Sequence, residues 1–294
     1  MIPPNNQFYG VGFAGGITEK TFNAVIDEAE RIYKPIFLAK GANFIVARNW
    51  TDGTVNAYAE QNGKNWKISM FGGLARHTET TPDAFAMVVC HEIGHHLGGV
   101  PKYKSMKWAS VEGQSDYYAT LKCMHKIIEN LQEWPTAFDV DPLVAERCQA
   151  VHGSIAKKYD ICVRSSNGGL ALARLLASLG GEKMPQFNTP DASKVTRTNE
   201  NHPAGQCRLD TYFAGAVCDA DITIDPSDTD EKVGSCVTGE ASLLRAAKQG
   251  MSAFADGMGS RPACWYSDKV PAPDEETDDD WWPWPDLQTK VSSL

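Results

Sequence analysis

The sequence predicts an α+β fold that is mostly helical and carries a small antiparallel sheet. Short strand-like runs occur near the N-terminus, at 44–47, 54–59 and 66–71. Longer segments with helical spacing of apolar residues follow them, so strands and helices do not alternate along the chain. The 294 residues are 42% apolar, which is enough to bury one large core. Segregated strands and helices of this kind are typical of α+β proteins.

The first expected helix opens at Thr18, and apolar residues from Phe22 to Ile32 recur at spacings of three and four. Pro35 should end this helix, because proline lacks a backbone N–H. The three strands come next, separated by turns at Asp52-Gly53 and Asn62-Gly63. Short turns between successive strands predict antiparallel pairing.

A strongly capped helix is expected at about 82–97, because Thr81 can cap it and Gly98 can end it. A second helix should run over about 110–131. Further helical stretches are expected at 141–159, 168–180, 203–219 and 239–255.

Charge is concentrated at the C-terminus. The chain has a net charge of −9, and seven acidic residues stand against one lysine after residue 270. We therefore divide the chain into a domain of residues 1–264 and an acidic tail rich in tryptophan and proline over 265–294. A near-neutral body without a basic run argues against a nucleic-acid partner, and no apolar run is long enough for an integral membrane segment. A peptide or protein substrate remains possible, and we expect a monomer.

Eight cysteines form an even set without a C-x-x-C pair. This favours disulfide bonds and an exported location, periplasmic or secreted, with any signal peptide already removed. Eight cysteines allow 105 pairings, and the sequence does not choose among them. Buried free thiols are the alternative.

The residues His91-Glu92-Ile93-Gly94-His95 fall within the 82–97 helix. Four residues make about one helical turn, so both imidazoles project from one face and can hold one metal ion. Glu92 lies beside them, where it can activate the water of the metal. This spacing is typical of a zinc site.

Catalytic zinc needs a third protein ligand. The same segment does not supply one, because Pro101 stands where H-E-x-x-H-x-x-G-x-x-H has its last histidine. Glu112, at the start of the next helix, can supply it. Asp116 follows on the same helical face, where it can accept the second N–H of a ligating histidine. Without a metal, Glu112 would be an ordinary surface acid.

At this point the chain resembles the gluzincin zinc metalloendopeptidases of the HtpX-type and CAAX-prenyl-protease-type family. Their pattern is H-E-x-x-H, then E-x-x-x-D on the next helix, then H-P-x-x-x-x-R. The second element here is Glu112-Gly113-Gln114-Ser115-Asp116, and the third is His202-Pro203-Ala204-Gly205-Gln206-Cys207-Arg208. The match spans about 54–218 and lacks the transmembrane helices of many members, so the chain looks more like the soluble exported branch.

The resemblance implies a zincin-like fold and a Zn²⁺ ion held by His91, His95 and Glu112, with Glu92 as general base. It places His202 near the oxyanion and Arg208 as the residue that orients that region. His202 as a capping or core histidine is the alternative. The resemblance also implies an edge strand that pairs with an extended substrate, formed here by Ile68, Ser69, Met70, Phe71, Gly72, Gly73 and Leu74.

Two other functions stay open at this point. A peptide-binding or chaperone-like protein could use the same groove without cutting its clients. A disulfide-stabilised interaction protein could carry the H-E-x-x-H by accident. The first would keep its activity when Glu92 is replaced by glutamine, and the second would bind no stoichiometric metal.

Overall fold

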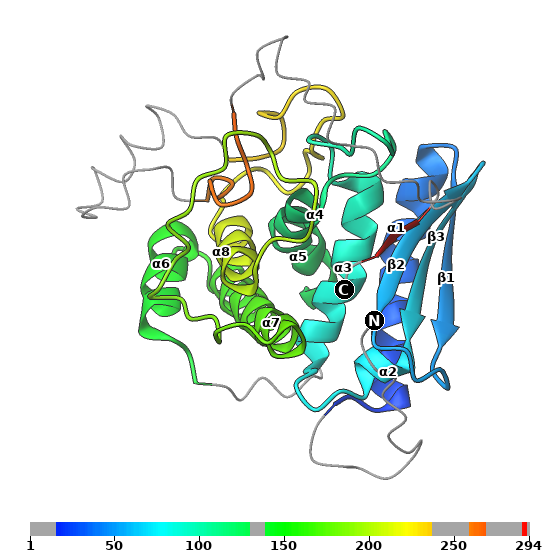
Figure 1. Cartoon of the computed structure of the whole chain (residues 1–294), viewed down its shortest axis with the longest axis horizontal. Coiled ribbons are helices and arrows are strands. Elements are labelled where there is room, and N and C mark those ends of the chain that lie inside the picture. The colour runs from blue at the N-terminus through cyan, green and yellow to red at the C-terminus, as the bar shows by residue number, and fades with distance from the viewer. Residues whose placement is uncertain (1–15, 130–138, 237–258, 269–289, 293–294) are drawn as a thin grey trace.

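The computed structural model describes residues 16–129, 139–236, 259–268 and 290–292. These residues form an α+β structure, as predicted, with the sheet on one side of a larger group of helices (Figure 1). In chain order the elements are α1 (Glu19–Ala39), β1 (Asn43–Asn49), β2 (Ala57–Asn62), β3 (Asn65–Phe71), α2 (Gly72–Ala75), α3 (Pro82–Leu97), α4 (Glu112–Tyr118), the π-helical segment η1 (Ala119–Cys123), α5 (Met124–Ile128), α6 (Pro142–His152), α7 (Ala156–Gly180), α8 (Gly205–Ala216) and β4 (Lys290–Ser292).

The sheet is mixed, so the prediction of a purely antiparallel sheet was wrong. Its order is β1-β3-β2-β4; β1 pairs with β3 in parallel, whereas β2 pairs with both β3 and β4 in antiparallel fashion. Only β2 and β3 are joined by a tight turn, in which Asn62 pairs with Asn65. The longer connection over 50–56 carries the chain from one side of β3 to the other, and β2 starts at Ala57 rather than at 54.

Helix α1 continues through Pro35 to Ala39, which corrects the expected end before Pro35. Thr18 caps it as expected, accepting a hydrogen bond from the backbone N–H of Thr21. Beyond the proline, Phe37 is buried and stacks on Phe44 of β1 with ring centroids 4.4 Å apart. Core packing of this last turn compensates for the backbone hydrogen bond that the proline removes.

Helix α3 lies between the sheet and the other helices, and it has the predicted boundaries (Figure 1). The Thr81 hydroxyl accepts from the backbone N–H of Ala84, and every residue from 84 to 97 is buried. Gly94 allows α4 to come close, because a Cβ atom there would lie 2.9 Å from the carbonyl oxygen of Ser115. The sequence of α3 therefore suits a central helix in contact with protein on all sides.

The second expected helix, over 110–131, occurs as α4, η1 and α5 in direct succession, and its description ends at residue 129. The stretches predicted at 141–159 and 168–180 are divided differently, into α6 and a long α7 that starts at Ala156. Helix α8 lies within the predicted 203–219. The helix expected at 239–255 lies outside the described residues.

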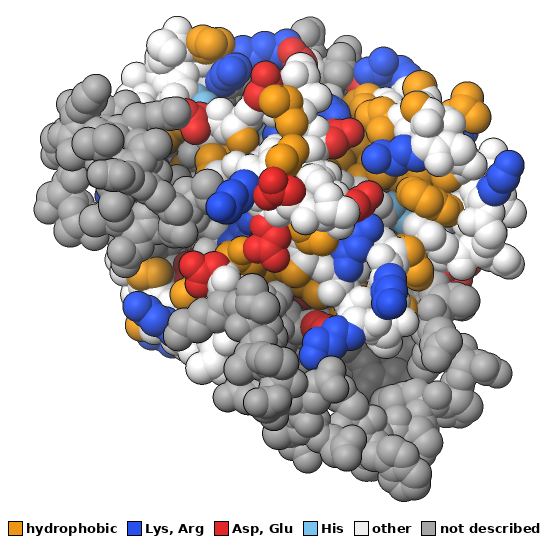
Figure 2. Space-filling view, turned by 90° about the horizontal axis from the view of Figure 1, so that it is seen from above, with side chains coloured by type: hydrophobic (Ala, Val, Ile, Leu, Met, Phe, Trp, Pro, Cys, Tyr) orange, Lys and Arg blue, Asp and Glu red, His pale blue; other side chains and the backbone are white. Residues whose placement is uncertain are grey.

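All eight cysteines are paired, in the bonds Cys90–Cys123, Cys148–Cys162, Cys207–Cys264 and Cys218–Cys236. These bonds fit the oxidising, extracellular type of environment that the cysteine count favoured. Across the part of the chain that the structure describes, no helix combines the length and apolar character that a membrane span requires. Figure 2 shows acidic and basic side chains interspersed over the coloured part of one face.

Part of the segment assigned to the tail belongs to packed structure. Trp265 is fully buried in a small cluster with Val111, Tyr117 and Leu121, beside the Cys207–Cys264 bond. Near the end of the chain, β4 joins the sheet next to β2. The acidic stretch between them, 269–289, lies outside the described residues.

Candidate metal centre

The structure brings together His91, His95 and Glu112. The histidines lie one turn apart on α3, and Glu112 is the first residue of α4. His91 Nε2 is 3.2 Å from Glu112 Oε2, and His95 Nε2 is 3.8 Å from Glu112 Oε1. All three side chains are buried, and one potential ligand atom from each lies within 4.8 Å of the other two. This group could bind a metal ion.

Hydrogen bonds at Nδ1 fix the tautomer of each imidazole. His91 Nδ1–H donates to Asp116 Oδ1 at 2.7 Å, and His95 Nδ1–H donates to the carbonyl oxygen of Ser110 at 2.8 Å. Neither a carbonyl nor a carboxylate oxygen can donate, so Nδ1 carries the proton in each ring. In the neutral rings the lone pair is therefore on Nε2, and among the described residues neither Nε2 has a hydrogen-bond partner. Neutral imidazole with Nε2 exposed to the site is the form that binds metals.

Asp116 holds His91 in place through a buried network. Arg208 on α8 donates from Nε to Oδ2 at 2.8 Å and from Nη2 to Oδ1 at 2.7 Å, and the Tyr212 hydroxyl donates to Oδ1 at 2.6 Å. Burial alone would raise the pKa of Asp116, but Arg208 and His91 outweigh it and lower that pKa. Burial likewise opposes the charge of Arg208, and Asp116 reverses the effect, so the pKa of Arg208 rises.

The charges of the cluster favour a cation. Glu92, Glu112 and Asp116 supply three buried carboxylates, whereas Arg208 supplies one buried guanidinium. With both imidazoles neutral, the ionised carboxylates of Glu112 and Asp116 exceed the Arg208 guanidinium by one negative charge, and buried charge normally requires a counter-charge or a metal. Without an ion, burial alone would lower the pKa of His91. The neighbouring carboxylates of Asp116 and Glu112 outweigh burial and raise the pKa of His91 to about 9. The fold thus attracts positive charge to this place.

The remaining predicted site residues lie at different depths. Glu92 is fully buried on α3 beside His91. His202 is 41% exposed, and its Nε2 atom is 3.4 Å from Glu112 Oε2. Arg208 is buried and bonded to Asp116, so it acts on the partner of a ligand and is a positioning residue. Of these three residues, His202 alone therefore reaches the protein surface.

Sequence reasoning missed Tyr103 and Tyr212. The Tyr103 hydroxyl donates to Glu112 Oε1 at 2.8 Å, from the loop between α3 and α4. Burial and the adjacent carboxylate raise the pKa of Tyr103, so it stays a donor at neutral pH. No spacing rule indicates it, because its position depends on the path of the loop. Tyr212 is four residues after Arg208 on α8, a helical spacing that could have indicated a shared partner.

The segment predicted to be the substrate-binding edge strand does not lie at an edge of the sheet. Of the residues Ile68, Ser69, Met70, Phe71, Gly72, Gly73 and Leu74, the first four lie in β3 and the last three in α2. Strand β3 is paired on both sides, with β1 and with β2, and cannot accept a further strand. The crossover that makes the sheet mixed also moves β3 into its interior.

His96 faces the sheet rather than the site. Its ring stacks between Trp66 and Trp108, with centroids 5.6 and 5.1 Å away, and Nδ1 lies 3.2 Å from Gln61 Nε2 on β2. Burial lowers the pKa of His96 to about 3, so it is neutral. His96 therefore joins α3 to the sheet and contributes nothing to the candidate metal centre.

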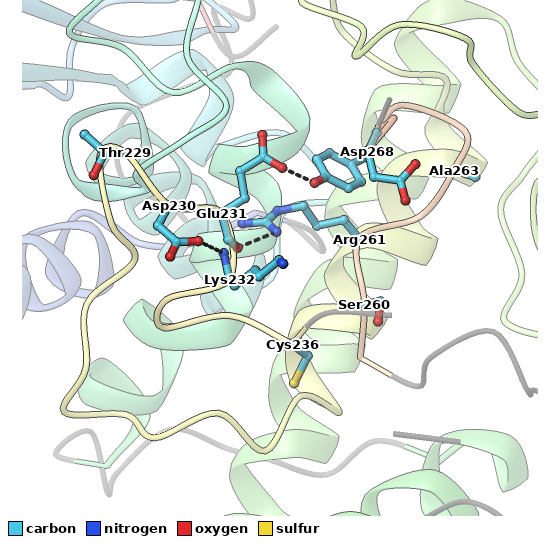
Figure 3. Close-up of a pocket in the computed structure, with 10 residues that line it drawn as sticks. Thr229, Asp230, Glu231, Lys232, Cys236, Ser260, Arg261, Ala263 and Asp268 are labelled. Carbon is cyan, nitrogen blue, oxygen red and sulfur yellow. Dashed lines mark hydrogen bonds between the residues drawn. The ribbon is translucent and has the colours of Figure 1, made fainter. Parts of the chain in front are cut away.

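A hollow of about 620 Å³ lies apart from the candidate metal centre, and Glu231, Arg261 and Tyr266 are among the residues that line it (Figure 3). The Arg261 guanidinium donates to Gln114 Oε1 at 2.6 Å and to the Glu231 carbonyl oxygen at 3.0 Å. It also donates to Ser235 Oγ at 3.1 Å. Arg261 thus ties this region to α4 through contacts within the protein.

Comparisons with protein-family models, with curated proteins and with solved structures give no match. The candidate metal centre is consequently defined by its own residues and geometry.

Proposed function

We propose that the protein is a zinc-dependent metalloendopeptidase with a zincin-like fold of the gluzincin type, active in an exported location. The observation that carries this proposal is the convergence of two imidazole Nε2 atoms, from His91 and His95, on the Glu112 carboxylate. Two nitrogen ligands disfavour calcium and magnesium, which prefer oxygen. Two histidines and one carboxylate are the ligand set of many catalytic zinc sites, which keep a fourth position open.

A zinc ion at these ligands would supply Lewis acidity towards water and towards a peptide carbonyl. In this proposal Glu92 removes a proton from water, holds it on its carboxylate and passes it to the leaving amine. His202, at the exposed side of the site, donates a hydrogen bond to the carbonyl oxygen as charge develops there. Asp116 and Arg208 keep His91 in its binding orientation throughout.

Replacement of Glu92 by glutamine tests the proposal. The variant should retain one zinc ion per chain and lose at least about 100-fold of its peptide hydrolysis, because it keeps the shape of Glu92 without the base. Glu79→Gln is the matched control, because Glu79 is exposed and is not one of the candidate site residues. Zinc content by mass spectrometry and cleavage of a quenched fluorescent peptide library are the measurements.

Equal hydrolysis by Glu92→Gln and wild type would refute the proposed mechanism. A wild-type protein that contains zinc and binds peptides but cuts none would favour the peptide-binding, chaperone-like alternative. A protein without stoichiometric metal would contradict both.

A further inference from the structure

The helix that carries Glu112 begins without a side-chain cap. Glu112 is the first residue of α4, and the side chain of Val111 before it forms no capping hydrogen bond. The first N–H groups of a helix have no partners within the helix, so this end is weakly restrained unless packing from outside holds it. The position of the Glu112 carboxylate therefore depends on what packs against the first turn of α4.

Residues 259–268, the bracing segment, pack against that turn. Trp265 is fully buried, and a Cβ atom at Gly113 would lie 2.2 Å from Cδ2 of its indole. Only a residue without a side chain leaves room for the ring at this distance. The indole thus lies against the backbone of the residue that directly follows Glu112.

Two hydrogen bonds also join the bracing segment to α4. Arg261 Nε donates to Gln114 Oε1 at 2.6 Å, and the Tyr117 hydroxyl donates to the Gly259 carbonyl oxygen. The amide of Gln114 in turn donates from Nε2 to the carbonyl oxygen of Gly98, at the end of α3, at 2.6 Å. Gln114 consequently links Arg261 to the helix that carries both candidate histidine ligands.

The bracing segment holds the loop that leads to His202 as well. The backbone N–H groups of Val195 and Asn199 donate to carbonyl oxygens of the segment at 2.9 and 2.8 Å. His202 follows shortly after them, and its Nε2 atom is 3.4 Å from Glu112 Oε2. One segment therefore contacts the two elements that carry His202 and Glu112.

The bracing segment is itself held by long-range contacts. No helix or strand lies within 259–268, so its conformation depends on what it packs against. The Cys207–Cys264 bond attaches it to α8, one residue before Arg208, which pairs with Asp116. The segment is thus fixed to the helix that supports one of the candidate histidine ligands through that carboxylate.

We propose that the bracing segment positions the candidate ligand Glu112, with Trp265 and Arg261 as its positioning residues. They act through the two residues that follow Glu112 in α4 and not through contact with an ion. Metal sites require ligands that are held close to the productive geometry by the surrounding packing. This role rests on the proposed metal centre, whereas it does not depend on peptide hydrolysis.

Gly113→Ala tests the contact with Trp265. Alanine favours a helix more than glycine does, so the change does not weaken α4 itself. The added methyl group forces the first turn and the indole apart, and zinc affinity in competition with a chelator should fall at least about tenfold. Trp265→Leu in the same chain makes room for the methyl group, so the double variant should bind zinc at least about threefold more tightly than Gly113→Ala alone.

Arg261→Lys is the second variant, because it keeps the charge but loses the planar guanidinium whose Nε donates to Gln114. Its zinc affinity should also fall about tenfold. Tyr266→Phe is the matched control within the bracing segment. It removes a hydrogen bond to Glu231, which is not part of α4, and keeps the ring that Arg261 contacts. Its zinc affinity should equal that of the wild-type chain.

Cobalt(II) in place of zinc provides the measurement that separates positioning from stability. At saturating cobalt, the visible absorption bands report the coordination geometry of the ion. The bands of Gly113→Ala and Arg261→Lys should therefore differ from those of the wild-type chain, whereas Tyr266→Phe should retain them. Circular dichroism checks that each variant is folded, and if Gly113→Ala does not fold, Arg261→Lys decides alone.

Wild-type zinc affinity in the folded variants would overturn the proposal, and so would weaker zinc binding with unchanged cobalt bands, which would show a purely structural role. A wild-type chain that binds neither zinc nor cobalt would overturn the metal centre together with this role. Weaker zinc binding and altered cobalt bands without peptide hydrolysis by any of the proteins would establish the positioning role and refute the peptidase proposal alone.

Discussion

Replacement of Asp116 by asparagine should separate the structural role of the buried network from its role at the metal. Asp116 accepts hydrogen bonds from His91, Arg208 and Tyr212, and it forms a buried ion pair with Arg208. Asparagine keeps the shape of Asp116 but removes the negative charge that pairs with the buried guanidinium. Loss of one partner of a buried ion pair costs about 3 to 5 kcal/mol, and loss of the carboxylate behind a ligating histidine weakens metal binding by about 10- to 100-fold.

Tyr212→Phe is the matched control, because it removes a single hydrogen bond to the same carboxylate, at a cost of about 1 kcal/mol. Urea unfolding of both variants with the disulfides intact and without metal measures the structural effect. Competition with a chelator measures zinc affinity in the folded protein. Unfolding free energies within about 1 kcal/mol of each other, together with equal zinc affinities, would refute the assigned role of Asp116.

Three further outcomes are expected. Tyr103→Phe should weaken zinc binding by up to about tenfold and lower the unfolding free energy in urea by no more than about 1 kcal/mol, since it removes the donor that orients Glu112. Replacement of both Cys90 and Cys123 by alanine should lower the unfolding free energy by about 3 to 4 kcal/mol in urea, because their bond closes a loop with a sequence separation of 33. Burial lowers the pKa of His125 to about 4, so the unfolded state gains its proton first and stability should fall between about pH 6.5 and 4. His125→Gln should flatten that part of the pH profile of the unfolding free energy, and an unchanged slope would contradict it.

The ligand set could be predicted because local rules determine most of it. Helical periodicity places His91 and His95 on one face, and the cap at Thr81 starts their helix where the sequence indicates. The approach of Glu112 depends on the next helix, which starts after the connection over 98–111. The partner of His95, the carbonyl oxygen of Ser110, was not predictable, because backbone groups leave no signal in residue type.

Features that depend on tertiary packing were predicted poorly. The crossover between β1 and β2 puts β3 inside the sheet, and turn residues at Asp52-Gly53 give no indication of that path. Pro35 was expected to end a helix because local propensity disfavours it there, but burial of Phe37 overrides that preference. Both errors arise because local sequence preferences were considered without the tertiary packing that overrides them.

Helices α3 and α4 are held close together on both sides of the candidate metal centre. Gly94 lets the backbones meet at Ser115, and the Cys90–Cys123 bond joins α3 to the segment that continues α4. Rigid contacts at both ends of the site therefore hold the carboxylates in place. If the proposed metal binds to this prearranged group and not to the unfolded chain, it would stabilise the folded protein, so metal affinity and folding stability would be linked at this site.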